Sequence, residues 1–280
     1  MWPVDPPSHT AEQVARACAV GMQDSQLSER ILDGLDFFTT NNTNYRAVAQ
    51  SEATHLITSA DYTIPSLSGD ELKWLYKNRF AKKGVPGRAI YNEIKRAAPN
   101  GLCSYCQYGV ATTLDHYAPK ATIPGLAIDP WNLIPACKDC NHTLRSGFSD
   151  QPESQILHPY FAPKLGRWLY ARVLRDMPII LEFFAAPDSA LPPVFAKRVA
   201  NQVEALGLGE LYSVVSSAEV PEISNNARRN FEVGDTENVR AHLLEMSEDG
   251  FEIDPNNRRA VIYEALAADD WYCSLGFSLR

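Results

Sequence analysis

Two Cys-x-x-Cys pairs constrain the fold of this chain more than any other feature of its sequence. Cys103 and Cys106 form the first pair, and Cys137 and Cys140 form the second. Each pair bends the backbone into a knuckle that presents two thiolates to one point, and a tetrahedral zinc ion needs four such ligands at about 2.3 Å each. Because four thiolates leave no open coordination position, the pattern predicts a structural Zn²⁺ rather than a catalytic one.

An iron–sulfur cluster or a redox dithiol would use the same type of residue. Thioredoxin-like chemistry needs a single motif in a βαβ setting, and the sequence has no such pattern around either pair. In a reducing compartment, clustered cysteines serve as metal ligands more often than as disulfides. The two remaining cysteines, Cys18 and Cys273, stand alone, and we expect each to be a small packed or partly exposed thiol.

The charge of the chain is uneven along its length. The 280 residues carry 34 acidic and 26 basic side chains, and the net charge of -8 argues against a protein that coats nucleic acid through a basic field. Residues 71–100 nevertheless hold eight Lys or Arg against two Glu, whereas residues 208–270 hold fourteen acidic residues against five Arg. The two segments suggest separate roles, and solvated helix surfaces are the alternative interpretation.

Neither a secretory signal nor a membrane span is visible in the sequence. The first residues, MWPVDPPSHTAEQ, lack a basic and an apolar region. The most apolar stretch, at 177–187, is too short to cross a bilayer and is interrupted by Glu182. We therefore expect a soluble, cytoplasmic protein without a membrane partner, whose hydrophobic content of 45% is enough to bury a core.

Apolar residues at spacings of three and four predict helices on both sides of the cysteine region. On the N-terminal side, Thr10 and either Ser68 or Asp70 are candidate N-caps, and the predicted helices lie at 10–23, 44–57, 70–83 and 88–98. On the C-terminal side the predicted helices lie at 194–208, 237–250 and 256–270. Residues 101–148 instead have the texture of short strands and loops, followed by one helix that starts near Cys137.

The segment between the cysteine pairs carries the candidate catalytic groups. Asp115 and His116 are adjacent, Asn132 follows in the proline-flanked WNLIP, and Asn141 comes directly after the last cysteine. Neighbouring residues on a strand point to opposite faces, so Asp115 and His116 can share a site only at a strand end or a bulge. Successive helix positions differ by about 100°, so Cys140 can face the zinc while Asn141 faces away from it.

Framed by the two knuckles, this series of residues over 101–148 resembles the HNH endonucleases, which have a ββα-metal fold. The resemblance implies an α+β protein, with a small ββα-metal core and its structural zinc at 101–150 and mainly helical regions at 1–100 and 151–280. It also implies roles for four residues. His116 would be the general base, Asp115 and Asn141 would hold a catalytic metal, and Asn132 would steady the loop that presents His116.

These residue types suit phosphodiester hydrolysis. A neutral imidazole accepts a water proton near physiological pH, and a carboxylate with an amide oxygen suits a hard divalent ion that acts as a Lewis acid. A single metal-binding carboxylate favours a one-metal mechanism, with Mg²⁺ or Mn²⁺ as the ion. At the third position of the motif the sequence has Asn141 followed by His142, so either residue can supply the ligand, and the place directly after the cysteine favours Asn141.

The resemblance makes DNA the expected partner of this site, and several basic residues are candidates for phosphate contacts. Lys120 and Arg145 flank the catalytic residues in sequence. Lys82, Lys83 and Arg88 belong to a basic run that can follow the DNA backbone without reading bases. For all five residues, a solvated surface cation is the alternative interpretation.

The flanks resemble a bacterial subgroup of this family that includes the HNH subunit of Septu-type anti-phage systems. Three segments carry this resemblance: 79–106, 158–162 (HPYFA) and 261–274 (VIYEALAADDWYCS). The resemblance implies an ATPase partner, a role in antiviral defence, and a C-terminal region that docks the partner. His158 is a further candidate for the site, with an anchor in a helix or loop as an equally good interpretation.

A zinc-organised nucleic-acid-binding or scaffolding module without catalytic activity is the competing interpretation. It needs the four cysteines and the basic residues, but it has no need of Asp115 and His116. These two residues therefore separate an enzyme from a binding module.

Overall fold

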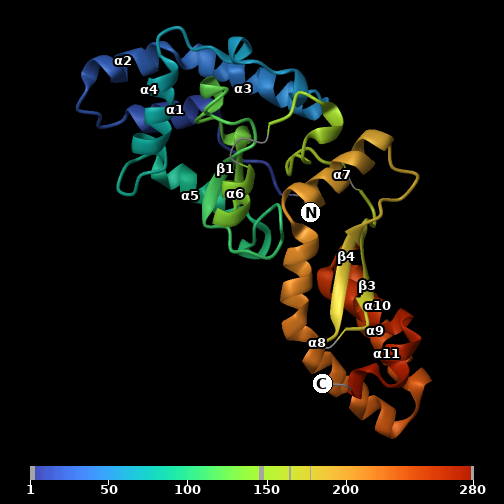
Figure 1. Cartoon of the computed structure of the whole chain (residues 1–280). Coiled ribbons are helices and arrows are strands. Elements are labelled where there is room, and N and C mark those ends of the chain that lie inside the picture. Colours follow the sequence, from blue (N-terminus) through green and yellow to red (C-terminus); the bar gives the residue numbers. More distant parts are fainter. Residues whose placement is uncertain (1–3, 145–147, 164, 177, 279–280) are drawn as a thin grey trace. The chain divides into compact units, whose positions relative to one another are not determined.

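The computed structural model describes residues 4–144, 148–163, 165–176 and 178–278. The chain forms two compact units, residues 1–163 and 164–280 (Figure 1). The sequence suggested boundaries after residues 100 and 150 instead. The difference has a physical reason, because the N-terminal helices and the cysteine region share one hydrophobic core.

The N-terminal unit combines helices with a two-stranded sheet. Its regular helices and strands are α1 (Ala11–Ala19), α2 (Ser25–Asp33), α3 (Leu35–Gln50), α4 (Gly69–Leu75), α5 (Arg88–Arg96), β1 (Thr113–His116), β2 (Leu133–Ala136) and α6 (Lys138–Leu144). Its short turns are the π-helical η3 (Tyr76–Phe80) and the 3₁₀ turns η1 (Thr54–Leu56), η2 (Ser59–Tyr62), η4 (Pro99–Gly101), η5 (Pro124–Leu126), η6 (Pro130–Asn132) and η7 (Pro152–Ser154).

Side-chain caps begin two of the expected helices. Thr10 caps α1 by accepting a hydrogen bond from the backbone of Gln13 at 3.2 Å. Ser68, and not Asp70, caps α4. In return, the Glu71 carboxylate accepts a hydrogen bond from the backbone N–H of Ser68 at 2.8 Å. Such reciprocal bonds satisfy amide groups that have no partner within the helix.

Helix α3 differs from the expectation at 44–57, since it starts at Leu35 and ends at Gln50. The sequence obscures its first half, because Asn41 and Asn42 are poor helix formers. Both are buried here, and their amides are bonded to other parts of the chain: Asn42 donates to the Asp129 carboxylate at 2.9 Å. Tertiary contacts therefore override the local preference.

Strands β1 and β2 pair antiparallel and lead into α6. The register places Asp115 opposite Ile134 and His116 opposite Leu133. The core that covers this sheet also includes residues of α1 to α5, and its members from the cysteine region are Leu114, Ile128 and Leu133. The helices before residue 100 are therefore part of the same folded body as the strands.

Residues up to 163 also belong to this unit, because two side chains tie them to it. Nε2 of His158 lies 3.1 Å from the Tyr45 hydroxyl on α3. The Tyr160 hydroxyl donates to the carbonyl oxygen of Leu133 on β2 at 2.6 Å. His158 is fully enclosed by aromatic rings, which makes it an anchor of the fold.

The C-terminal unit packs helices against a β-hairpin. Its elements are β3 (Leu169–Leu174), β4 (Ile180–Ala185), α7 (Pro193–Ala205), α8 (Leu208–Val233), α9 (Thr236–Ile253), α10 (Arg258–Ala268), α11 (Asp270–Ser274) and the 3₁₀ turn η8 (Gly276–Ser278). The hairpin corrects the expectation that the chain after residue 148 is helical. Leu181 and Phe183 alternate inward on β4, but the near-continuous apolar run around them hides the two-residue period of a strand.

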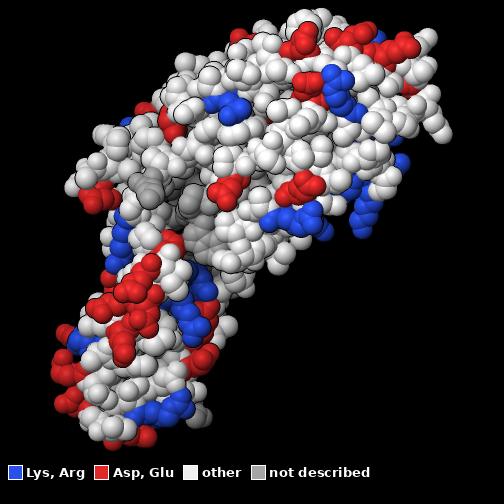
Figure 2. All heavy atoms as spheres, turned by 180° about the vertical axis from the view of Figure 1, so that it is seen from behind, with Lys and Arg blue, Asp and Glu red and all other residues white. Residues whose placement is uncertain are grey.

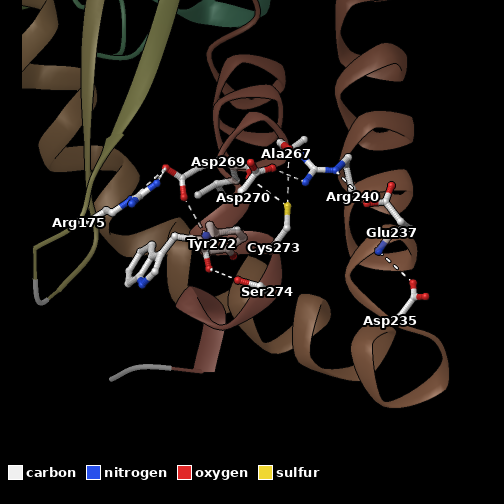
Figure 3. A network of polar contacts seen from close by, with 12 residues as sticks. Arg175, Asp235, Glu237, Arg240, Ala267, Asp269, Asp270, Tyr272, Cys273 and Ser274 are labelled. Atoms are coloured by element: carbon white, nitrogen blue, oxygen red, sulfur yellow. Dashed lines mark hydrogen bonds and ion pairs between the residues drawn. The ribbon is translucent and has the colours of Figure 1, made fainter.

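Ion pairs join three elements of the C-terminal unit at the start of α11 (Figure 3). Arg175, after β3, lies 3.2 Å from the Asp269 carboxylate. Arg240 on α9 pairs with Asp270 at 2.7 Å and also donates to the carbonyl oxygen of Ala267 at the end of α10. Glu219, Glu237 and Glu264 also pair with arginines, so at least five of the acidic residues of 208–270 form ion pairs inside the unit. On the face drawn in Figure 2, other acidic side chains gather on this unit, with Lys and Arg beside them.

The expected α+β class is confirmed, with a small sheet, a four-cysteine site and flanking helices. Among the described residues, no helix combines the length and the apolar character needed to cross a membrane.

Candidate active site and metal centre

The four paired cysteines meet at one point. Their sulfur atoms all lie within 4.8 Å of one another and all four residues are buried. A tetrahedron with bonds of about 2.3 Å separates its sulfur ligands by about 3.8 Å, and Sγ of Cys106 lies 3.9 Å from Sγ of Cys137. The cysteines therefore fit the structural zinc that their spacing predicted.

Backbone amides support both knuckles. The N–H of Gly109 donates to Cys106 Sγ at 3.4 Å, and the N–H of Cys140 donates to Cys137 Sγ at 3.4 Å. Gly109 must be glycine, because an added Cβ would lie 2.8 Å from the Cβ of Cys137. Bonds of this kind orient metal ligands and stabilise the thiolate form.

Asp115 lies near the end of β1 with its carboxylate turned toward the first knuckle. The Tyr105 hydroxyl, between Cys103 and Cys106, donates to Oδ2 of Asp115 at 3.0 Å. The side chain is 5% exposed, and this burial raises the pKa of Asp115 to about 6. A bound cation would oppose this shift, because an opposite charge favours the ionised form.

His116, the last residue of β1, is held in one tautomer. Its Nε2 lies 2.9 Å from the carbonyl oxygen of Ala127. Since a carbonyl oxygen only accepts, Nε2 carries the proton and Nδ1 is left with a lone pair. Burial lowers the pKa of His116 to about 3, so the ring is neutral near pH 7. The ring of Tyr76 packs edge-on against it, with ring centres 4.4 Å apart.

Asn132 ties together the loop between β1 and β2. Its Oδ1 accepts from the backbone N–H of Ala118 at 2.7 Å, and its Nδ2 donates to the carbonyl oxygens of Ala118 at 2.9 Å and Leu126 at 3.2 Å. This side chain is completely buried. One side-chain amide therefore closes the loop that begins directly after His116.

Asn141 on α6 contacts β1 next to Asp115. Its Nδ2 donates to Oγ1 of Thr113 at 3.0 Å and to the carbonyl oxygen of Leu114 at 3.2 Å. The amide nitrogen is thus hydrogen-bonded to β1, which leaves Oδ1 as the side-chain atom that can bind a metal. His142, the alternative ligand, is exposed. The geometry favours Asn141 over His142.

Asp115 and His116 line one small pocket at the end of β1. Asn141 does not line this pocket, and it lies instead in an open depression with Thr113 and His142. The enclosed volume beside Asp115 and His116 is ≈ 10 Å³, room for about one water molecule. The structure thus brings two of the four expected residues, Asp115 and His116, to one cavity. Asn141 does not reach this cavity but is hydrogen-bonded to β1, the strand that carries both residues.

The segment 148–156 closes this pocket. Phe148, Ser149, Gln155 and Ile156 form the wall opposite the catalytic pair. Gln155 is the main tie, because its Oε1 accepts from the Thr54 hydroxyl at 2.6 Å and its Nε2 donates to the carbonyl oxygen of Ser149 at 2.9 Å. With this segment in its described position, the pocket is too small to hold a phosphodiester.

The basic candidates occupy different environments. Lys120 reaches the site, since its Nζ lies 5.1 Å from the centre of the Tyr76 ring that packs on His116. Lys82 and Lys83 are exposed after η3. Arg88 is engaged within the fold, because its guanidinium lies over the Tyr91 ring and donates to Asn92. Arg145 lies outside the described residues.

Three residues that sequence reasoning did not select complete the site: Tyr105, Tyr76 and Asp129. Asp129 accepts from the backbone N–H of Trp131 at 2.9 Å and starts the turn that contains Asn132. The Asp-Pro pair at 129–130 was a readable signal, because proline favours the first position of a helical turn and aspartate the cap before it. Tyr105 and Tyr76 carry no such signal.

Comparison with known proteins supports this geometry. Residues 103–147 match the family model described as HNH endonuclease. Protein ea31 of Escherichia phage lambda is 22% identical over 228 residues, which cover 78% of this chain and 77% of that protein. No solved structure matches the chain. The chain therefore contains an HNH endonuclease domain at residues 103–147, built around a four-cysteine metal site.

Proposed function

We propose that this protein is a metal-dependent endonuclease that hydrolyses DNA phosphodiester bonds. The observation that carries the proposal is the convergence of Asp115 and the fixed tautomer of His116 on one pocket, inside a domain that matches the HNH endonucleases. A binding module would not require a neutral imidazole with a directed lone pair.

His116 acts as the general base. With Nε2–H bonded to Ala127, Nδ1 is the atom that accepts the proton of an attacking water. Asn132 contributes by holding the loop that carries Ala127, because it closes the chain between residues 118 and 126. The acceptor for Nε2–H is thereby fixed in place.

Asp115 and Asn141 are the residues that would hold the catalytic ion, and because they line different depressions here, the ion would have to draw their oxygen atoms together. One carboxylate and one amide oxygen are hard ligands, which fits Mg²⁺ or Mn²⁺ better than a soft metal. When bound, such an ion stabilises negative charge that builds up on the phosphate. Lys120, beside Tyr76, is placed to contact another oxygen of the phosphate that the ion would bind.

Substitution of His116 provides the direct test. We expect His116→Ala to keep its zinc content and its fold but to lose Mg²⁺- or Mn²⁺-dependent nicking of supercoiled plasmid by about 100-fold or more, in line with the loss of a general base. His242→Ala is the matched control, because His242 lies on α9, outside the unit that holds the candidate site, and it should nick like the parent. Equal nicking by His116→Ala and the parent would leave the non-catalytic scaffold as the better description.

We also propose that the nuclease serves antiviral defence with an ATPase partner. The support is the resemblance of the flanks to Septu-type HNH subunits, together with a pocket that is closed in the isolated chain. The acidic C-terminal unit is the proposed docking surface. Purification of the tagged protein from its native host should recover an ATPase, and recovery of the protein alone during infection would count against this role.

A further inference from the structure

A groove on the N-terminal unit combines an exposed indole with an exposed lysine. Residues 21–24 form one wall, and Trp74, Asn78, Arg79 and Lys82 form the other. Its volume of ≈ 420 Å³ falls within the range of about 300–1,000 Å³ for pockets that hold small organic groups. We call it the Trp74 groove.

The walls of the groove are fixed from within the fold. Arg79 donates from Nε to the carbonyl oxygen of Cys18 at 2.9 Å and bonds also to that of Val20, which ties the loop to η3. The Asp24 carboxylate accepts from the backbone N–H of Leu27 at 2.9 Å and caps α2. The groove is therefore preformed, and its acidic residue, Asp24, is hydrogen-bonded to the start of α2.

Trp74, Asn78 and Lys82 recur at intervals of four and line the same groove across the π-helical turn. Trp74 is 43% exposed, although an indole of this size is normally covered. Nδ2 of Asn78 donates to the carbonyl oxygen of Trp74 at 3.0 Å, so its Oδ1 is an acceptor at the same place. Together they offer a stacking surface, a hydrogen-bond acceptor and a cation.

The charge around the groove complements an anion. Lys77, Lys82 and Lys83 are exposed and have no carboxylate within salt-bridge distance in the described part of the chain. Lys73 differs, since it pairs with Asp70 at 2.7 Å. An exposed aromatic ring among unpaired lysines is the combination that binds single-stranded nucleic acid, where bases stack on the ring and phosphates meet the cations.

We propose that the Trp74 groove binds one unpaired nucleotide of a DNA strand, with the base on Trp74 and a neighbouring phosphate on Lys82. A paired base is stacked within its duplex and cannot offer its face to the indole, so the groove selects single-stranded or distorted DNA. The inference rests on the proposed nuclease function and names its substrate class.

The groove is joined to the catalytic site through one short element. Tyr76 belongs to the same π-helical turn as Asn78 and Arg79. Its ring packs on His116, and its hydroxyl donates to the carbonyl oxygen of Leu114 on β1 at 3.3 Å. π-Helical turns occur often at functional sites, and here one turn presents residues to both the groove and the general base.

Binding measurements in a His116→Ala background test the proposal without cleavage. The probes are a fluorescent twelve-nucleotide oligothymidylate and a duplex of the same length, followed by anisotropy. Trp74→Ala should weaken single-strand binding by about 5- to 150-fold, which corresponds to the stacking of one base, and should change duplex binding little. Trp74→Phe should restore most of the affinity. Phe37→Ala, which removes another aromatic ring that is 44% exposed, is the matched control.

The salt dependence gives a second readout. Lys82→Ala should reduce the slope of log affinity against log salt by about 0.7, as expected for one lost phosphate contact on a single strand. Unchanged single-strand binding by Trp74→Ala, or an equal loss for single strand and duplex, would overturn the proposal. Because binding is measured without cleavage, a parent protein that binds through Trp74 but never nicks DNA would disprove the nuclease and leave the groove intact.

Discussion

At the scale of single residues, burial acts in opposite directions on the two catalytic candidates. Removal from water disfavours the charged form of each group, so it raises the pKa of Asp115 to about 6 and lowers that of His116 to about 3. His116 is consequently neutral near pH 7, and the same burial weakens it as a base, because the protonated ring is disfavoured. Asp115 gains from a cation at its side, because a cation offsets the cost of burying its charge.

The buried amide of Asn132 offers a stability test at this scale. Asn132→Ala leaves the N–H of Ala118 and two carbonyl oxygens without their partner. We expect the free energy of unfolding to fall by about 2–3 kcal/mol, measured by urea titration. Asn44→Ala, at an exposed position of α3, should change it little, and equal losses for the two variants would contradict the role of Asn132 in the loop.

His158 gives a pH prediction. Burial lowers its pKa from 6.5 to about 3, so between these values the unfolded chain binds a proton that the folded chain does not. The free energy of unfolding therefore falls as pH decreases through this window, by up to about 1.4 kcal/mol per pH unit from this group.

The comparison protein for this prediction is His158→Phe, which lacks the titrating ring. As the pH is lowered from 6.5 to 4, the free energy of unfolding of the parent should fall by more than that of the variant. Parallel curves for the two proteins over this range would show that His158 takes up its proton equally in the folded and unfolded states, and would contradict the prediction.

At the scale of elements, the segment 148–156 lines the same pocket as the proposed catalytic pair, Asp115 and His116. It closes a cavity of ≈ 10 Å³ over Asp115 and His116. Its described ties include the Gln155 side chain and the bond from the Tyr117 hydroxyl to the carbonyl oxygen of Ile156 at 2.8 Å. Surface segments outside the regular helices and strands open at a lower cost in free energy than the core does.

Gln155→Ala should therefore raise the rate of plasmid nicking severalfold while it lowers the free energy of unfolding by about 1 kcal/mol or more. Gln151→Ala is the control, since Gln151 is an exposed glutamine of the same segment whose side-chain amide donates to the neighbouring Asp150. A nicking rate that falls together with stability would mean that the segment supports the site rather than blocking it.

At the scale of the whole molecule, the zinc site belongs to one of two compact units. The four cysteines lie between residues 103 and 140, inside the unit that ends at residue 163. The second unit has its own packing, with β4 against α8 and α9 against α10. The consequences of losing zinc should therefore stop at the boundary between the units.

Cys137→Ser should lower zinc content and destabilise residues 1–163, because metal binding is coupled to folding. Hydrogen exchange read by mass spectrometry should show lost protection in β2 and α6, with protection retained in α10. Cys273→Ser, in the second unit, should keep about one zinc per chain. A zinc-free Cys137→Ser protein with full protection in β2 would contradict the structural role of the metal.

Local sequence was informative wherever a residue's role depends on its near neighbours. The Cys-x-x-Cys spacing predicted the metal site, and Thr10 predicted the start of α1. The helix expected at 70–83 exists only in part, since α4 gives way to the π-helical η3 at Tyr76. The β3–β4 hairpin and the 26-residue α8 were not anticipated, because their apolar patterns are set by which faces are buried in the finished unit.

The sequence by itself determined the four-cysteine site and the α+β character, because these follow from residue type and short spacing, whereas the candidate catalytic residues came from the resemblance to the HNH endonucleases. Only the tertiary structure decided that Asn132 closes the loop after His116, that Tyr105 bonds to Asp115, and that segment 148–156 covers them both. Contacts of this kind join residues that are far apart along the chain. They depend on how the core packs, and no local pattern encodes which distant side chain will fill a given space.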